Sequence, residues 1–198
     1  MNTRGNYSFN QIRAKVIVFR DYFCDGPYAM LESDFFLLPH QELEFHDFVS
    51  SIKAEGGGDE PENALEAIAL AMKSDWVEIK NPQTEKARNI IIVFTDASAH
   101  PFEKSSDNIS EYYPADMLKS YDELCNAWCG DELSENEAKY KMNRTTERLV
   151  IFAPEHAYPW SQMADDMINT IYIPISEAEG GIEINGSIIA SALGASMI

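Results

Sequence analysis

The run Ile90-Ile91-Ile92-Val93-Phe94 constrains the fold of this chain more than any other segment. Its apolar residues, most of them β-branched, do not alternate with polar ones, which predicts a strand buried on both faces. Strands of this kind lie in the centre of parallel sheets whose two faces are covered by helices. The sequence therefore predicts an α/β fold.

The other segments predict strands and helices around this central strand. A strand is expected over residues 15–20 and a shorter one over 34–38, and the short connection between them predicts antiparallel pairing. Further strands are expected over 149–153 and 171–175. The whole pattern predicts an open, mostly parallel Rossmann-like sheet with helices on both faces and one antiparallel edge strand. Amphipathic helices are expected over residues 44–53, 61–73, 118–128, 160–168 and 186–198.

Length and charge limit the classes of protein to consider. The 198 residues are enough for one domain over residues 1–198, with 1–13 as a loop or helix remnant and 97–147 as an elaborated crossover insertion. The net charge of −18 should repel nucleic acid backbones and anionic membranes. With no signal peptide and no apolar run near twenty residues, we expect a cytoplasmic protein.

A glycine loop with carboxylates, Gly56-Gly57-Gly58-Asp59-Glu60-Pro61-Glu62, precedes the second predicted helix. One interpretation is a helix start, with Asp59 as the N-cap and Glu62 as its reciprocal capping partner. Three glycines exceed what a cap needs, however, and glycine lets the backbone approach a ligand closely. The loop is therefore also a candidate for half of a hard-cation site.

The second motif, Thr95-Asp96-Ala97-Ser98, follows the buried strand. Its residues should lie at the carboxyl edge of the sheet, where open parallel α/β sheets bind ligands. Asp96 would ligate a cation or orient a bound water there, or else form a turn. Arg20 and Asp21 end another predicted parallel strand, so they would line the same edge or form an ion pair on it.

Together the two motifs resemble the metal-ion-dependent adhesion site (MIDAS) of von Willebrand factor type A (VWA) domains. In that family three loops hold one Mg²⁺ or Mn²⁺: Asp-x-Ser-x-Ser after the first strand, a glycine-rich loop, and an aspartate after the fourth strand. Asp96 matches the third loop. The glycine loop is similar to the acidic loop in the VWA-like domain of the integrin β family, which implies Glu62 as a metal ligand and Asp59 as part of a neighbouring cation site.

The resemblance covers roughly residues 14–198 and implies a protein-protein interaction module rather than an enzyme. In such a module the cation keeps an open coordination position, which an acidic side chain of the partner fills. Ser98, Arg20 and Asp21 would then contact the partner. Bacterial members of this kind are intracellular, so the resemblance also implies a cytoplasmic protein.

One part of the family pattern is absent. No apolar strand ending in Asp-x-Ser-x-Ser precedes Lys15, although the family's first strand is the central one. Without it two strand edges would face a gap, and each unpaired buried backbone group costs about 1–3 kcal/mol. Residues upstream of Met1, direct closure of the sheet, or another chain would solve this, and we favour the first. We expect metal binding by this chain alone to be weak or absent.

Three alternatives to this interpretation are open. In the first, Asp96-Ala97-Ser98-Ala99-His100 would be the Asp-x-Ser-x-Ser loop, but the glycine loop would then lie upstream of it, in the wrong order for the family. A haloacid-dehalogenase-like phosphatase would need a second acid where Ser98 stands. An interaction scaffold of the same fold that uses no metal would differ from the adhesion module only in its independence of Mg²⁺ or Mn²⁺.

Overall fold

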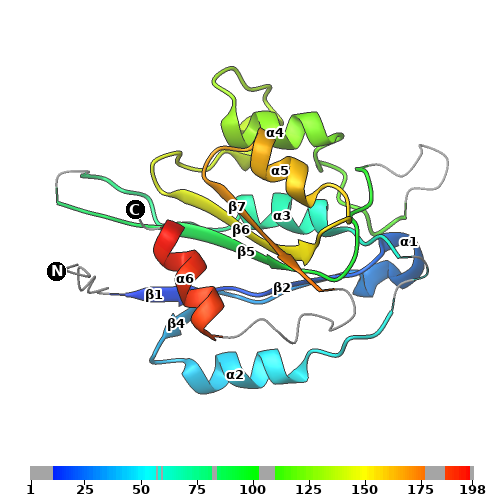
Figure 1. The fold of residues 1–198 in the computed structure, drawn as a ribbon, viewed down its shortest axis with the longest axis horizontal. Helices are drawn as coiled ribbons and strands as arrows, with labels where there is room; N and C mark the ends of the chain where they lie inside the picture. Colours follow the sequence, from blue (N-terminus) through cyan, green and yellow to red (C-terminus); the bar gives the residue numbers. More distant parts are fainter. Residues whose placement is uncertain are drawn as a thin grey trace.

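The computed structural model has a three-stranded parallel sheet, two antiparallel strand pairs, and helices on both faces of the parallel sheet (Figure 1). The parallel sheet has the order β5-β6-β7, with strands at Asn89–Phe94, Glu147–Pro154 and Thr170–Ile175. These strands were expected from their apolar runs, so the predicted α/β fold is confirmed. The structure describes residues 11–56, 58, 60–81, 84–102, 110–176 and 186–196.

Strand β6 divides the core into two layers. Leu149 and Ile151 point to the face covered by α3 (Ala64–Met72), α4 (Tyr121–Cys129) and α5 (Trp160–Asp166). Val150 and Phe152 point to the opposite face, where α6 (Gly186–Ser196) covers them (Figure 1). This alternation explains why the strand reads as a continuous apolar run, because both of its faces are buried.

The antiparallel part of the fold differs from the prediction. Strand β2 (Ile17–Phe19) pairs with β3 (Met30–Glu32), whereas β4 (Phe36–Leu38) pairs with β1 (Ile12–Ala14). The antiparallel pairing of 15–20 with 34–38 was therefore wrong in its register, and residues 12–14 are a strand rather than a loop. The remainder of the predicted 1–13 remnant, residues 1–10, lies outside the described residues.

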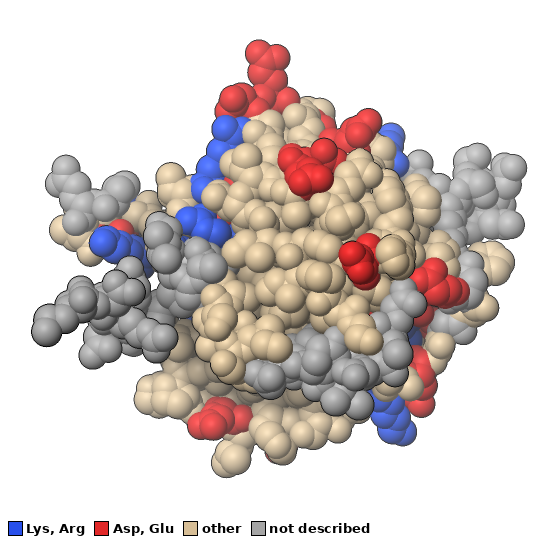
Figure 2. Space-filling view, in the orientation of Figure 1, with Lys and Arg blue, Asp and Glu red and all other residues tan. Residues whose placement is uncertain are grey.

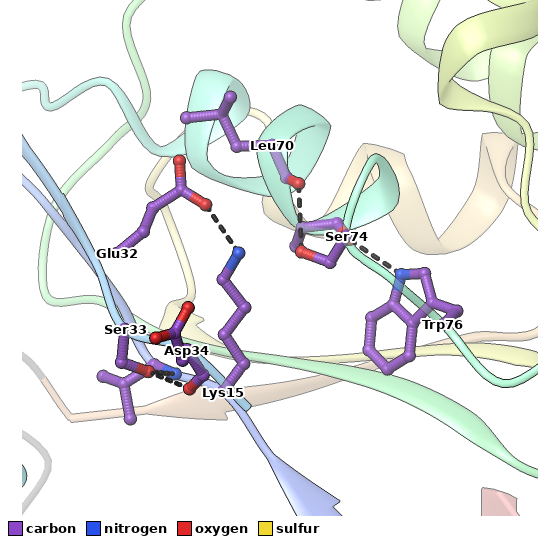
Figure 3. Close-up of polar contacts among 9 residues, drawn as sticks. Lys15, Glu32, Ser33, Asp34, Leu70, Ser74 and Trp76 are labelled. Atoms are coloured by element: carbon purple, nitrogen blue, oxygen red, sulfur yellow. Dashed lines mark hydrogen bonds and ion pairs between the residues drawn. The ribbon is translucent and has the colours of Figure 1, made fainter. Parts of the chain in front are cut away.

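A compact turn explains the change of register. Helix α1 (Tyr22–Asp25) and the 3-10 helix η1 (Gly26–Tyr28) reverse the chain, so β3 begins earlier than expected. The ladder is interrupted where the Val16 amide donates to Ser33 Oγ at 3.0 Å. Beside this interruption, Lys15 Nζ lies 2.7 Å from Glu32 Oε2, and the Ser33 hydroxyl donates to the Asp34 carbonyl (Figure 3).

Helices α2 and α3 overlap the predicted segments 44–53 and 61–73, with ends that differ by one to three residues. Helix α2 (Glu42–Ser51) packs on β4, with the Phe36 ring 5.6 Å from that of Phe45. Helix α3 ends where Ser74 Oγ donates to the Leu70 carbonyl and Trp76 Nε1 donates to that of Ala71 (Figure 3). No helix among the described residues is long and apolar enough to cross a membrane.

Strands β2 and β5 are not joined. In the described part of the chain, β5 pairs only with β6 and β2 pairs only with β3. Both strands run toward the side of the molecule where α1 lies, and α3 contacts both of them (Figure 1). Direct closure of the sheet, one of the three solutions considered for the absent first strand, is therefore wrong for this structure.

Candidate functional site

The glycine loop and the segment after β5 are held together by backbone hydrogen bonds. The Glu62 amide donates to the Ser98 carbonyl at 3.0 Å, and the His100 amide donates to the Glu62 carbonyl at 2.8 Å. The Ser98 amide in turn donates to Glu60 Oε1 at 2.8 Å. Glu62 and Ser98, which lie far apart in the sequence, thus meet at the carboxyl edge of the parallel sheet.

Asp96 lies in the turn directly after β5 and is exposed to solvent. The turn is shaped by Thr95, whose Oγ1 accepts from the Ala97 amide at 3.2 Å. From the opposite side, Trp160 Nε1 of α5 donates to the Ala97 carbonyl at 2.9 Å. The turn is therefore fixed from within and from α5, while the Asp96 side chain faces solvent.

Arg20 connects the end of β2 to the chain before the glycine loop. Its guanidinium donates to the carbonyls of Glu55, Tyr28 and Lys53 at 2.6, 2.8 and 3.1 Å. Through these hydrogen bonds the Arg20 guanidinium links the segments that contain Tyr28 and Lys53–Glu55. The prediction that Arg20 contacts a partner stays a prediction.

Asp21 is buried, with 1% of its surface exposed. Its Oδ1 accepts from the Phe23 amide at 2.7 Å and so caps α1, and its Oδ2 lies 3.4 Å from Nε2 of the buried His100. Contact of Asp21 with a partner likewise stays a prediction. No local pattern in the sequence indicated the pairing with His100, because the two residues lie on separate segments.

Helix α3 begins later than the sequence predicted. Its first residue is Ala64, so the N-cap position falls at Asn63, and the capping pair of Asp59 and Glu62 is wrong. Asn63 Oδ1 accepts from the Tyr22 amide at 2.7 Å, which ties the helix start to α1. Asp59 itself lies outside the described residues.

Helix α3 also carries a buried carboxylate. Glu66 is fully buried, and its Oε1 accepts from the Tyr113 hydroxyl at 2.8 Å. The Tyr113 ring meets that of Tyr22 edge to face at 5.2 Å. Burial, with a contribution from the Glu66 charge, raises the pKa of Tyr22 to about 12. Tyr22, the first residue of α1, and Tyr113 are therefore held against each other, and Tyr113 is also held by Glu66.

Replacing Gly56 with Ala is expected to destabilise the fold by about 1–3 kcal/mol. Gly56 has a φ of 103°, and a Cβ there would lie 2.3 Å from Asp25 Oδ1 and 2.8 Å from Arg20 Cδ. Urea unfolding measures the loss. The control is Gly186→Ala, because a Cβ on Gly186 meets nothing within 4 Å. Equal stability of the two variants would contradict the assigned role of Gly56.

The described residues do not fit a complete cation site. No group of three His, Cys, Asp or Glu side chains among them could hold a metal ion together. Glu62 and Asp96 are both at the sheet edge, but they do not form such a group. The ligand role predicted for Asp96, Glu62 and Asp59 therefore stays a prediction.

Comparison with protein families gives one match. Residues 37–113 match the family model of the von Willebrand factor A domain. The matched segment begins in β4 and includes α2, the glycine loop, α3 and β5. A comparison with curated proteins and one with solved structures each found no match.

Proposed function

Because residues 37–113 match a von Willebrand factor A-type domain, we propose that this chain is a module that binds another protein through the carboxyl edge of its sheet. The observation that carries the proposal is the pairing of Glu62 with the Ser98–His100 segment. It places the glycine loop beside the turn that presents Asp96. A rigid sheet that presents adjoining loops is the usual arrangement of binding residues.

The exposed groups of this edge suit a basic partner surface. Asp96 and Glu60 are both exposed, and the chain as a whole carries a net charge of −18. In Figure 2 the Asp and Glu side chains lie over the top and right of the visible face, whereas Lys and Arg gather mostly on the left. Such a field speeds the association of positively charged partners.

Metal-assisted adhesion is the finer form of the proposal. Asp96 and Glu62, together with Asp59 as the resemblance implies, would hold Mg²⁺ or Mn²⁺, and the cation would supply an open coordination position for an acidic side chain of the partner. The described residues alone do not complete this site, and Asp59 lies outside them. In both forms the module is cytoplasmic and is not an enzyme, as the resemblance to intracellular bacterial modules implies.

The partner assignment is tested by quantitative affinity enrichment from cells that express the tagged chain. Asp96→Ala is expected to reduce recovery of the specific partner at least tenfold, because this exposed carboxylate is the centre of the proposed edge. Glu135→Ala is the matched control, since Glu135 is also exposed but lies between α4 and β6. Equal recovery by both variants would contradict the proposal.

Thermal unfolding distinguishes the two forms. After chelation, millimolar Mg²⁺ should raise the melting temperature by a few degrees if the site binds metal, because a ligand at 100 times its dissociation constant contributes about 2.7 kcal/mol. Loss of the shift in Asp96→Ala would support metal-assisted adhesion. A cooperative transition without any shift would support the metal-independent scaffold.

A further inference from the structure

We propose that an aromatic cleft beside α1 binds a proline-rich, extended segment of a partner protein. The cleft has a volume of about 540 Å³ and is formed by α1, η1 and residues 110–112. Residues of the Asp96 turn are not among its described lining residues, so the cleft can be tested separately from that turn. The inference rests on the proposed function only in taking the partner to be a protein. The lining includes Tyr22, Phe23, Pro27, Tyr28, Glu111 and Tyr112.

Three of the aromatic side chains that line this cleft are exposed to solvent, whereas Tyr22 is buried. Phe23, Tyr28 and Tyr112 have 63%, 75% and 49% of their surface in solvent. A single exposed aromatic ring is ordinary, but several that share one concave surface mark an interaction site. These three therefore point to a ligand that covers aromatic rings.

The wall of the cleft is formed before any ligand binds. Gly26, with a φ of 52°, brings its backbone against the Tyr112 ring, where a Cβ would meet Tyr112 carbons at 3.4 Å. Behind this position, the rings of Tyr22 and Tyr113 contact each other edge to face. A preformed surface of this kind loses little conformational entropy on binding.

The lining chemistry favours a polyproline II helix. Such a helix has about three residues per turn and no internal hydrogen bonds, so its carbonyls are free to accept from tyrosine hydroxyls. Proline-rich segments dock on aromatic-lined grooves because their conformation is set in advance. Nucleic acid bases also stack on aromatic rings, but a chain with a net charge of −18 repels the phosphate backbone.

The charges of the cleft favour a ligand that carries a basic residue beside its prolines. Asp25 and Glu111 both line the cleft, and no Lys or Arg is among its described lining residues. Asp25 Oδ2 already accepts from the Asp21 amide at 3.2 Å, whereas Glu111 is exposed. A segment with Arg beside its prolines would thus place a guanidinium near the Glu111 carboxylate while its pyrrolidine rings cover the aromatic side chains.

The test uses fluorescence anisotropy of a fluorescein-labelled peptide, Arg-Pro-Pro-Leu-Pro-Pro-Arg, with the purified chain. We expect saturable binding, weakened at least tenfold by Tyr112→Ala and by Tyr28→Ala. Tyr112→Phe should retain binding within a few fold, because it keeps the ring, and this variant guards against loss through misfolding. The control is Tyr158→Ala, since Tyr158 has the same 49% exposure as Tyr112 but does not line the cleft.

Several outcomes would overturn the assignment. They are the absence of saturable binding to the unaltered chain, equal binding of Arg-Ala-Ala-Leu-Ala-Ala-Arg, or an equal effect of Tyr158→Ala and Tyr112→Ala. Because the probe is a purified peptide, such a failure concerns the cleft alone. The enrichment result for Asp96→Ala tests the sheet edge separately.

Discussion

Replacing Glu147 with Gln is expected to raise the free energy of unfolding at pH 8.5 by about 3 kcal/mol. Glu147 is fully buried at the start of β6, and no described group forms a hydrogen bond with either carboxylate oxygen. Burial raises its pKa to about 7, although Arg144, Arg148 and Lys141 lower it in part. Because the carboxyl is hard to ionise inside the fold, its charge at high pH opposes folding.

The direction of the pH dependence follows from the raised pKa. The neutral carboxyl favours the folded state fully below the unfolded value of about 4.5, and this contribution is lost as the pH rises through about 7. At about 1.4 kcal/mol per pKa unit, the total difference is about 3 kcal/mol. Between pH 5.5 and 8.5 the unaltered chain should lose about 2 kcal/mol relative to Glu147→Gln.

Urea unfolding across this pH range measures the effect. Glu132→Gln is the control, because Glu132 is exposed and its substitution should leave the pH profile unchanged. If Glu147→Gln and Glu132→Gln have the same profile as the unaltered chain, the assignment of a neutral, buried Glu147 is contradicted.

Replacing Trp160 with Ala should lower the free energy of unfolding by about 3–5 kcal/mol. Trp160 is fully buried in the core that α5 shares with the sheet, beside Met163. Its Nε1 also donates to the Ala97 carbonyl in the turn that carries Asp96. The substitution therefore leaves a cavity and removes a hydrogen bond that fixes the candidate site.

Two further variants separate the cavity from the hydrogen bond. Trp160→Phe fills most of the volume but leaves the Ala97 carbonyl without this donor, so we expect a loss of about 1–3 kcal/mol. Trp76→Ala removes a Trp that is only partly buried and donates to Ala71, so its loss should be smaller than that of Trp160→Ala. Equal losses for Trp160→Ala and Trp76→Ala in urea unfolding would contradict the assigned position of Trp160.

The sequence predicted those parts of the fold whose pattern is local. The unbroken apolar run of β5 and the apolar segments that became β6 and β7 indicated buried strands, and the 3.6-residue spacing in Leu65, Ile68 and Met72 indicated the buried face of α3. The placement of Asp96 after β5 followed from the end of the apolar run.

The parts that the sequence did not predict depend on contacts between distant segments. β1 and β3 are short and lack a clear alternation, so nothing in Ile12–Ala14 marked a strand. The start of α3 depends on Asn63, whose side chain accepts from the Tyr22 amide rather than from an amide of its own helix. The burial of Asp21 beside His100 could not be inferred from either residue's neighbours in the sequence.

Site-specific photo-crosslinking is the most direct test of the claim that this chain binds its partner through the carboxyl edge of the sheet. A photoreactive amino acid replaces Phe94 in one variant and Lys141 in the other, so the Asp96 carboxylate stays in place. Both positions are exposed, but Phe94 ends β5 at the carboxyl edge, whereas Lys141 precedes the opposite, amino end of β6. We expect a discrete adduct with one partner from position 94 and none from position 141. Adducts of equal yield from both positions, or from position 141 alone, would contradict this claim.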